Sequence, residues 1–120
     1  MFITKEYLKE KNACYEGTKW FLQNFPDGGE YQAVLDKLAL EDRIDWAQWL
    51  LQKTGPVDTV LEIEELTCET SIVWAGSIIV KGAIKIAKWL ISGSGIKAGS
   101  GIKAGSGIKA GSGIKAGWGI

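Results

Sequence analysis

The sequence of 120 residues contains no histidine, only two prolines and only two cysteines. Without histidine, the chain lacks the commonest general base, the commonest zinc ligand and every His-dependent catalytic triad. Two cysteines are too few for a disulfide framework or a metal cluster. We therefore expect no enzymatic activity, no metal site and no cofactor.

Both cysteines, Cys14 and Cys68, lie among apolar residues. We expect buried free thiols, with a disulfide between the two as the alternative. The N-terminal residues 1–6 lack the basic start and the continuous apolar run of a secretory signal peptide. These features predict an intracellular protein in a reducing compartment.

Acidic residues are missing from the second half of the chain. All 14 acids lie in residues 1–69, which also hold seven bases and have a formal charge of −7. From residue 70 onward there are seven lysines and no acid, which gives +7. The net charge of zero therefore hides two oppositely charged halves, a pattern that bears on partners rather than on the fold.

A six-residue repeat, Ile-Lys-Ala-Gly-Ser-Gly, begins at Ile96 and contains many of the 16 glycines. Ile and Ala point to one side of a short strand, Lys points to the other, and the Gly-Ser-Gly segment allows a corner. Extending the spacing of six in both directions gives eleven consecutive aliphatic positions: Ile120, Ile114, Ile108, Ile102, Ile96, Leu90, Ile84, Ile78, Ile72, Leu66 and Val60.

The side chains at a second inward position become smaller along the repeat. Cys68, Trp74, Val80 and Ile86 occupy it first, and Ala98, Ala104, Ala110 and Ala116 occupy it later. Stacked short strands with glycine corners predict a β-solenoid over residues 59–120, with two or three strands per coil. A flexible low-complexity tail is the alternative.

The first part, residues 1–58, predicts a small helical bundle, so the fold class is α+β. Thr4 is a plausible N-cap for a helix to about Lys11, and a second helix is expected within residues 13–25, before the turn Pro26-Asp27-Gly28-Gly29. Tyr31, Val34, Leu35 and Leu38 form the stripe of a third helix. Asp42 or Asp45 would cap a fourth, which carries Trp46, Trp49 and Leu50 and ends near Thr54-Gly55-Pro56; we expect these tryptophans and Trp20 to be core.

The two ends of the solenoid differ. The helical unit is expected to cover the first coil, whereas the last coil has no cap and ends in apolar residues. We therefore predict a homodimer through the C-terminal coil, with Ile114, Trp118 and Ile120 in the interface. The alternative is that Trp118 folds over its own coil.

Residues 72–91 are about long enough to span a membrane, but Lys81, Lys85 and Lys88 interrupt them. As a helix, the segment would be cationic and amphipathic. Its apolar positions are in phase with the glycine-rich hexads, which favours strands. Cationic association with a membrane surface stays as an alternative function.

Three groups of residues carry a family resemblance. They are Ala13-Cys14 with Gly17 and Trp20, then Phe25-Pro26-Asp27-Gly28 with Tyr31, then Asp45-Trp46-Ala47-Gln48-Trp49-Leu50. With the repeat tail, this pattern resembles phage and prophage proteins that join a Trp-rich helical head to short repeats. The resemblance implies the cytoplasm of a bacterial host cell. By analogy, small proteins of this setting often inhibit host defences, including CRISPR systems.

We therefore predict a non-enzymatic, anti-CRISPR-like protein that inhibits a nucleic-acid-handling defence complex of the host by occluding a charged surface. A self-assembling structural protein built on the solenoid is the alternative. An acidic surface that mimics nucleic acid is preferred, and its residues are Glu30, Asp36, Glu41, Asp42, Asp45, Asp58, Glu62, Glu64 and Glu65. The other candidate is the basic ladder of Lys97, Lys103, Lys109 and Lys115. Direct nucleic-acid binding is less favoured, because lysines six apart are spread over two or three faces.

Overall fold

A computed structural model describes residues 1–117 of the chain. The first part holds β1 (Phe2–Ile3), α1 (Lys5–Glu10), α2 (Tyr15–Asn24), β2 (Gly29–Glu30), α3 (Tyr31–Leu40) and α4 (Ile44–Thr54). The second part holds β3 (Val60–Ile63), β4 (Leu66–Cys68), β5 (Ile72–Trp74), β6 (Ser77–Val80), β7 (Ile84–Ile86), β8 (Trp89–Ser92), β9 (Gly95–Ala98), β10 (Ile102–Ala104), β11 (Gly107–Ala110) and β12 (Gly113–Ala116). The fold is α+β: four helices precede a parallel β-solenoid of about three turns.

Local capping explains where the helices begin and end. The predicted N-cap Thr4 accepts a hydrogen bond from the Tyr7 N–H at 3.1 Å, and the Sγ of Cys14 caps α2. The expected caps of α4 are wrong, because Arg43 occupies the N-cap and Asp45 lies inside the helix. Asp42 instead follows the end of α3 with a φ of 60°, and the neighbouring N–H groups turn back to the α3 carbonyls, which is a Schellman ending.

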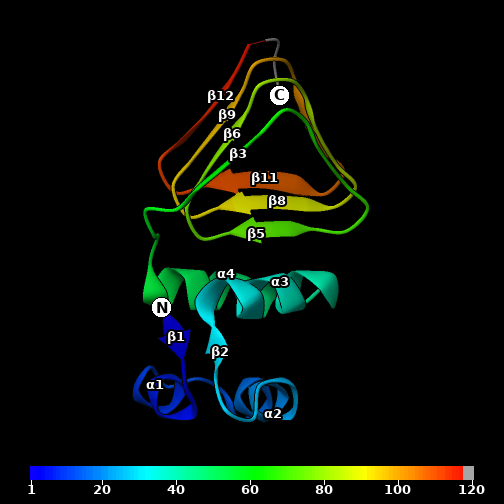
Figure 1. Cartoon of the computed structure of the whole chain (residues 1–120). Coiled ribbons are helices and arrows are strands. Elements are labelled where there is room, and N and C mark those ends of the chain that lie inside the picture. Colours follow the sequence, from blue (N-terminus) through cyan, green and yellow to red (C-terminus); the bar gives the residue numbers. More distant parts are fainter. Residues whose placement is uncertain (118–120) are drawn as a thin grey trace.

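The four helices form two layers, with α3 and α4 between the α1–α2 pair and the solenoid (Figure 1). The predicted stripe of α3 is confirmed, because Tyr31, Val34, Leu35 and Leu38 are all buried. In α4 the buried residues are Ile44, Ala47 and Leu50. The tryptophans that we expected in the core, Trp20, Trp46 and Trp49, are only half-buried. Strands β1 and β2, which were not predicted from the sequence, pair antiparallel between these two layers (Figure 1).

Three strands make each coil of the solenoid, which resolves the choice between two and three. The sheets have the strand orders β12-β9-β6-β3, β10-β7-β4 and β11-β8-β5, so the coil has a triangular outline (Figure 1). Ile78 lies beside Ile96, and Ile96 lies beside Ile114, so one coil takes 18 residues. Parallel stacking in this register places the aliphatic positions from residue 66 onward in one inner core.

The first strand departs from the register of six. Leu61, not Val60, lies beside Ile78, and the side chain of Val60 is exposed. The corner between β3 and β4 is one residue shorter than the later corners, because Ile63 pairs with Val80 whereas Leu66 pairs with Ile84. The prediction that Val60 continues the inner row is therefore wrong, and Ile120 lies outside the described residues.

The helices cover a flank of the solenoid rather than its whole first coil. Val73 and Ile91, the outward residues of β5 and β8, are buried in one core with the helices. The head also caps the free edge of β5 in the first coil. The Gln32 side chain accepts a hydrogen bond from the Ala75 N–H at 2.9 Å and donates one to the Val73 carbonyl at 2.7 Å. These are groups that a further strand would otherwise bind, so the expected protection by the head holds for β5.

Residues 72–91 form β5, β6, β7 and part of β8, so the strands favoured for this segment are confirmed and the alternative of an amphipathic helix is wrong. The expectation of buried cysteines fails. Both cysteines are free, but Cys14 is exposed and Cys68 is half-buried. Cys14 is the N-cap residue of α2, where its Sγ accepts a hydrogen bond from the Gly17 N–H at 3.3 Å. None of the helices formed by residues 1–117 has the length and apolar character needed to cross a membrane.

Candidate functional site

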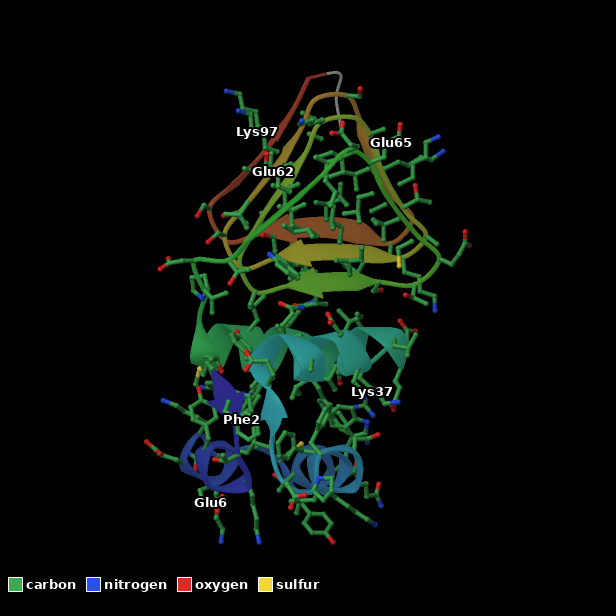
Figure 2. The ribbon with its side chains drawn as sticks, in the orientation of Figure 1. Phe2, Glu6, Lys37, Glu62, Glu65 and Lys97 are labelled. Atoms are coloured by element: carbon green, nitrogen blue, oxygen red, sulfur yellow. The ribbon has the colours of Figure 1, made fainter. Side chains whose placement is uncertain are left out.

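Four of the nine predicted acidic residues lie on the first coil of the solenoid, not on the helical head. They are Asp58, Glu62, Glu64 and Glu65; with Glu69, which the prediction omitted, we call them the acidic rim. All five are exposed. In residues 1–117, Glu64 alone among them has a salt bridge, to Lys81 at 3.3 Å. Glu62 and Glu65 lie at the first coil on different faces of the triangle (Figure 2).

Of the five predicted acidic residues in the head, four have a cationic partner within the chain. Glu30 pairs with the N-terminal ammonium group at 3.1 Å, Glu41 with Lys37 at 3.2 Å and Asp45 with Arg43 at 3.4 Å. Asp42 lies 3.7 Å from Lys88 of the solenoid, and Asp36 accepts a hydrogen bond from Gln32. The structure therefore divides the predicted acidic surface into a paired head and a largely unpaired rim.

One of these head carboxylates is also hydrogen-bonded to an aromatic side chain. The Trp20 indole N–H donates to the Oε1 of Glu41 at 3.0 Å. This bond, followed by the one from Lys37, lowers the pKa of the Glu41 carboxyl below its ordinary value. Glu41 thus stays ionised, and its carboxylate binds Trp20 and Lys37 within the head.

The predicted basic ladder is distributed over three faces. Lys97 and Lys115 stack directly on β9 and β12, and Lys103 stacks on Lys85 of β7. Lys109 occupies the face that the helices cover, where its Nζ donates to the Gln48 Oε1 at 3.3 Å. The expectation that these lysines are spread over two or three faces is confirmed. Lys85 was missed as a member, although a spacing of 18 residues from Lys103 would have identified it.

The charge split of the sequence becomes a charge gradient along the solenoid axis. The acidic rim belongs to the first coil, and the stacked lysine pairs belong to the second and later coils. Opposite charges at the two ends give the solenoid a direction, which bears on partner orientation and on self-association.

Of the three predicted interface residues, Ile114 is half-buried on β12, and Trp118 and Ile120 lie outside the described residues. β12 pairs with β9 on one side, and no other strand formed by residues 1–117 pairs with its second side. Within the same residues, no three or more side chains of the metal-binding types come together.

The fold and the site define a helical head packed on the flank of a three-sided β-solenoid whose first coil is acidic. Residues 1–54, which make up the four helices, match the family model described as the YdhT N-terminal domain. This match indicates a family of uncharacterised proteins and covers the head alone, so the resemblance of the whole chain to phage proteins stays a prediction. Neither the curated proteins nor the solved structures include a match to the chain.

Proposed function

We propose that the protein is a non-enzymatic inhibitor that occupies a basic, nucleic-acid-binding surface of a host defence complex through its acidic rim. The observation that carries this proposal is the rim itself, which has five exposed carboxylates on one coil. Only one of the five, Glu64, forms a salt bridge with another of residues 1–117. A set of largely unpaired carboxylates around one coil attracts a basic channel and excludes nucleic acid from it. The anti-CRISPR setting is the most specific form of the proposal and rests on the resemblance to phage proteins.

The contrast between the rim and the head supports this choice of surface. Head carboxylates such as Glu41 and Asp45 already have a cation of the same chain within 4 Å. A partner would have to break those pairs before it could use these groups. The carboxylates of Asp58, Glu62 and Glu65 need no such exchange, and the stacked strands hold their backbone in place.

The first prediction removes charge from the rim. Changing Asp58→Asn, Glu62→Gln and Glu65→Gln together should abolish capture of a nucleic-acid-handling complex from nuclease-treated lysate of a bacterium with an active CRISPR system. Capture by the native chain should weaken as salt is raised, because screening shortens the reach of the rim. The captured proteins would be identified by mass spectrometry.

The matched control removes three charges elsewhere. Glu6, Glu10 and Glu16 are exposed, take part in no salt bridge within residues 1–117, and lie on α1 and α2. Glu6 is at the far end of the molecule from Glu65 (Figure 2). Changing these three to glutamine should leave capture intact. Equal capture by the rim variant and the control variant would refute the proposal.

Self-association is the second candidate function, favoured by the open edge of β12. End-to-end stacking of the coils that residues 1–117 form is poorly matched in continuous register, because the first and last of their solenoid strands, β3 and β12, belong to the same sheet. A copy stacked through β3 on β12 would leave the other two faces one strand short, and Gln32 already occupies the edge of β5. These features favour a closed dimer through β12 over an open filament.

The second prediction concerns this dimer. Two antiparallel β12 strands would bring two copies of Lys115 close together, so dimerisation should strengthen as salt is raised. Ile114→Asn should weaken the dimer at least tenfold, whereas Leu40→Asn, at an exposed apolar residue of the head, should not. Sedimentation equilibrium measures both. Growth of the mass beyond a dimer would favour end-to-end assembly, and a monomer at every concentration would contradict both forms of association.

A further inference from the structure

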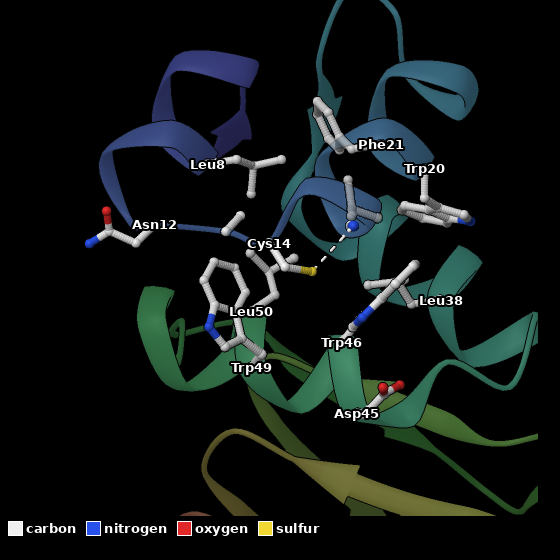
Figure 3. A pocket seen from close by; sticks show the side chains of 13 residues that line it. Leu8, Asn12, Cys14, Trp20, Phe21, Leu38, Asp45, Trp46, Trp49 and Leu50 are labelled. Atoms are coloured by element: carbon white, nitrogen blue, oxygen red, sulfur yellow. Dashed lines mark hydrogen bonds between the residues drawn. The ribbon is translucent and has the colours of Figure 1, made fainter.

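The helical head contains an apolar pocket of about 290 Å³ between α2 and α4 (Figure 3). Its walls include Trp20, Trp46 and Trp49, together with the thiol of Cys14. Every lining residue lies between Leu8 and Leu50, inside the segment that matches the family model. The pocket is separate from the acidic rim, so an argument about it does not depend on the function proposed above.

Polar contacts on the outside hold two of the aromatic walls in place. The Trp20 indole is fixed by its hydrogen bond to Glu41, and the Arg43 guanidinium lies 3.3 Å from the centre of the Trp46 ring. Trp20 and Trp46 meet edge to face, with ring centroids 6.2 Å apart. Preformed aromatic surfaces of this kind bind a ligand at a lower entropic cost than mobile ones.

A glycine keeps the pocket open. Gly17 lies inside α2, where glycine is less favourable than alanine, and its φ is not in the left-handed region. Helix geometry therefore does not require a glycine at this position. A Cβ at Gly17 would lie 3.2 Å from the Cys14 Sγ and 3.9 Å from the Trp46 ring, which places it at the pocket wall. The chain thus carries a residue that is poor for the helix and good for an empty pocket.

We propose that this pocket binds a small, uncharged, planar aromatic molecule. The volume suits one or two fused rings, and three indole rings offer faces and edges for stacking. No lysine or arginine is among the residues that line the pocket, so an anion would find no counter-charge there. The one carboxylate of the lining, Asp45, is already paired with Arg43, which argues against a cation.

Cys14 provides a reporter of occupancy within the intact chain. The native protein would be alkylated with iodoacetamide with and without 2-naphthol, and the modification of each cysteine would be followed by peptide mass spectrometry. Saturating 2-naphthol should slow alkylation of Cys14 at least tenfold and leave Cys68, which lies in the solenoid, unchanged. The anion 2-naphthalenesulfonate should protect neither cysteine.

Filling the pocket supplies the second measurement. Gly17→Leu should reduce the binding of 2-naphthol, measured by equilibrium dialysis, at least tenfold. Gln23→Leu adds the same side chain at an exposed position of α2 and should bind like the native chain. If Gly17→Leu does not fold, Gly17→Ala replaces it, with a smaller loss of binding. Equal protection of both cysteines, or undiminished binding by a folded Gly17 variant, would overturn the proposal.

Discussion

Replacing Gly93 by alanine is expected to lower the free energy of unfolding by about 3 kcal/mol. A Cβ at this corner would overlap the carbonyl oxygen of Ala75 in the coil below and would press on Leu51 of α4. The backbone of Gly93 cannot move away freely, because its N–H donates to the Trp74 carbonyl at 2.8 Å. Urea denaturation followed by circular dichroism measures the loss as a lower midpoint.

The matched control is the second glycine of the same corner. A Cβ at Gly95 would approach no atom closer than the Gly113 carbonyl oxygen at 3.6 Å, which is an ordinary contact. Gly95→Ala should therefore be neutral, or should gain about 0.5 kcal/mol because the unfolded chain loses freedom. Equal midpoints for the two variants would show that close stacking at the corner does not explain the glycine.

These two glycines also show how far the repeat could be interpreted from sequence. The spacing of six predicted the solenoid and its inner row, because inward apolar positions recur wherever identical corners recur. The sequence could not show that Gly93 is sterically required while Gly95 is less constrained. That difference depends on which carbonyl lies 18 residues earlier, and hence on the number of strands per coil.

Departures from the repeat were harder to predict. Val60 and Leu61 are both aliphatic, so only the pairing of Leu61 with Ile78 reveals the shorter first corner. In α4, Trp46 and Trp49 follow the spacing of a core stripe, but the helix packs between two layers and buries the small Ala47 completely. The tryptophans then line the pocket that Gly17 leaves open. When a helix packs between two layers, the tertiary structure decides which of its faces is buried, and the sequence of the helix alone does not show it.

The charged surfaces, too, have features that the sequence predicted and features that it could not predict. The sequence predicted that the acids lie in the first half and that the lysines are spread over faces, because both follow from chain position and strand period. It could not predict which carboxylates are neutralised. Asp42 and Lys88 are brought together by the packing of the head on the solenoid, and Glu64 and Lys81 by the stacking of successive coils.

Gln32→Glu is expected to destabilise the protein by about 2 kcal/mol at neutral pH. The substitution keeps the shape of the side chain but replaces its NH₂ group with an oxygen. That oxygen would face the Val73 carbonyl and the Asp36 carboxylate, which now accept hydrogen bonds at 2.7 and 2.8 Å. The bond from the Ala75 N–H to Oε1 could remain, but the edge of β5 would lose the bond to its Val73 carbonyl, which links the head to the solenoid.

The pH dependence of this variant distinguishes a lost hydrogen bond from a general loss of packing. Two acceptors facing the new carboxyl raise its pKa in the folded state, so the protonated form, which can donate to the Val73 carbonyl, is favoured by folding. The stability deficit relative to the native chain should therefore be small below about pH 4.3, the ordinary pKa of glutamate, and should grow as the pH rises. Gln23→Glu, with the same charge change at an exposed site, should show no such dependence. A deficit that is constant with pH, or no deficit at all, would contradict the role assigned to the hydrogen bonds that the Gln32 NH₂ group donates.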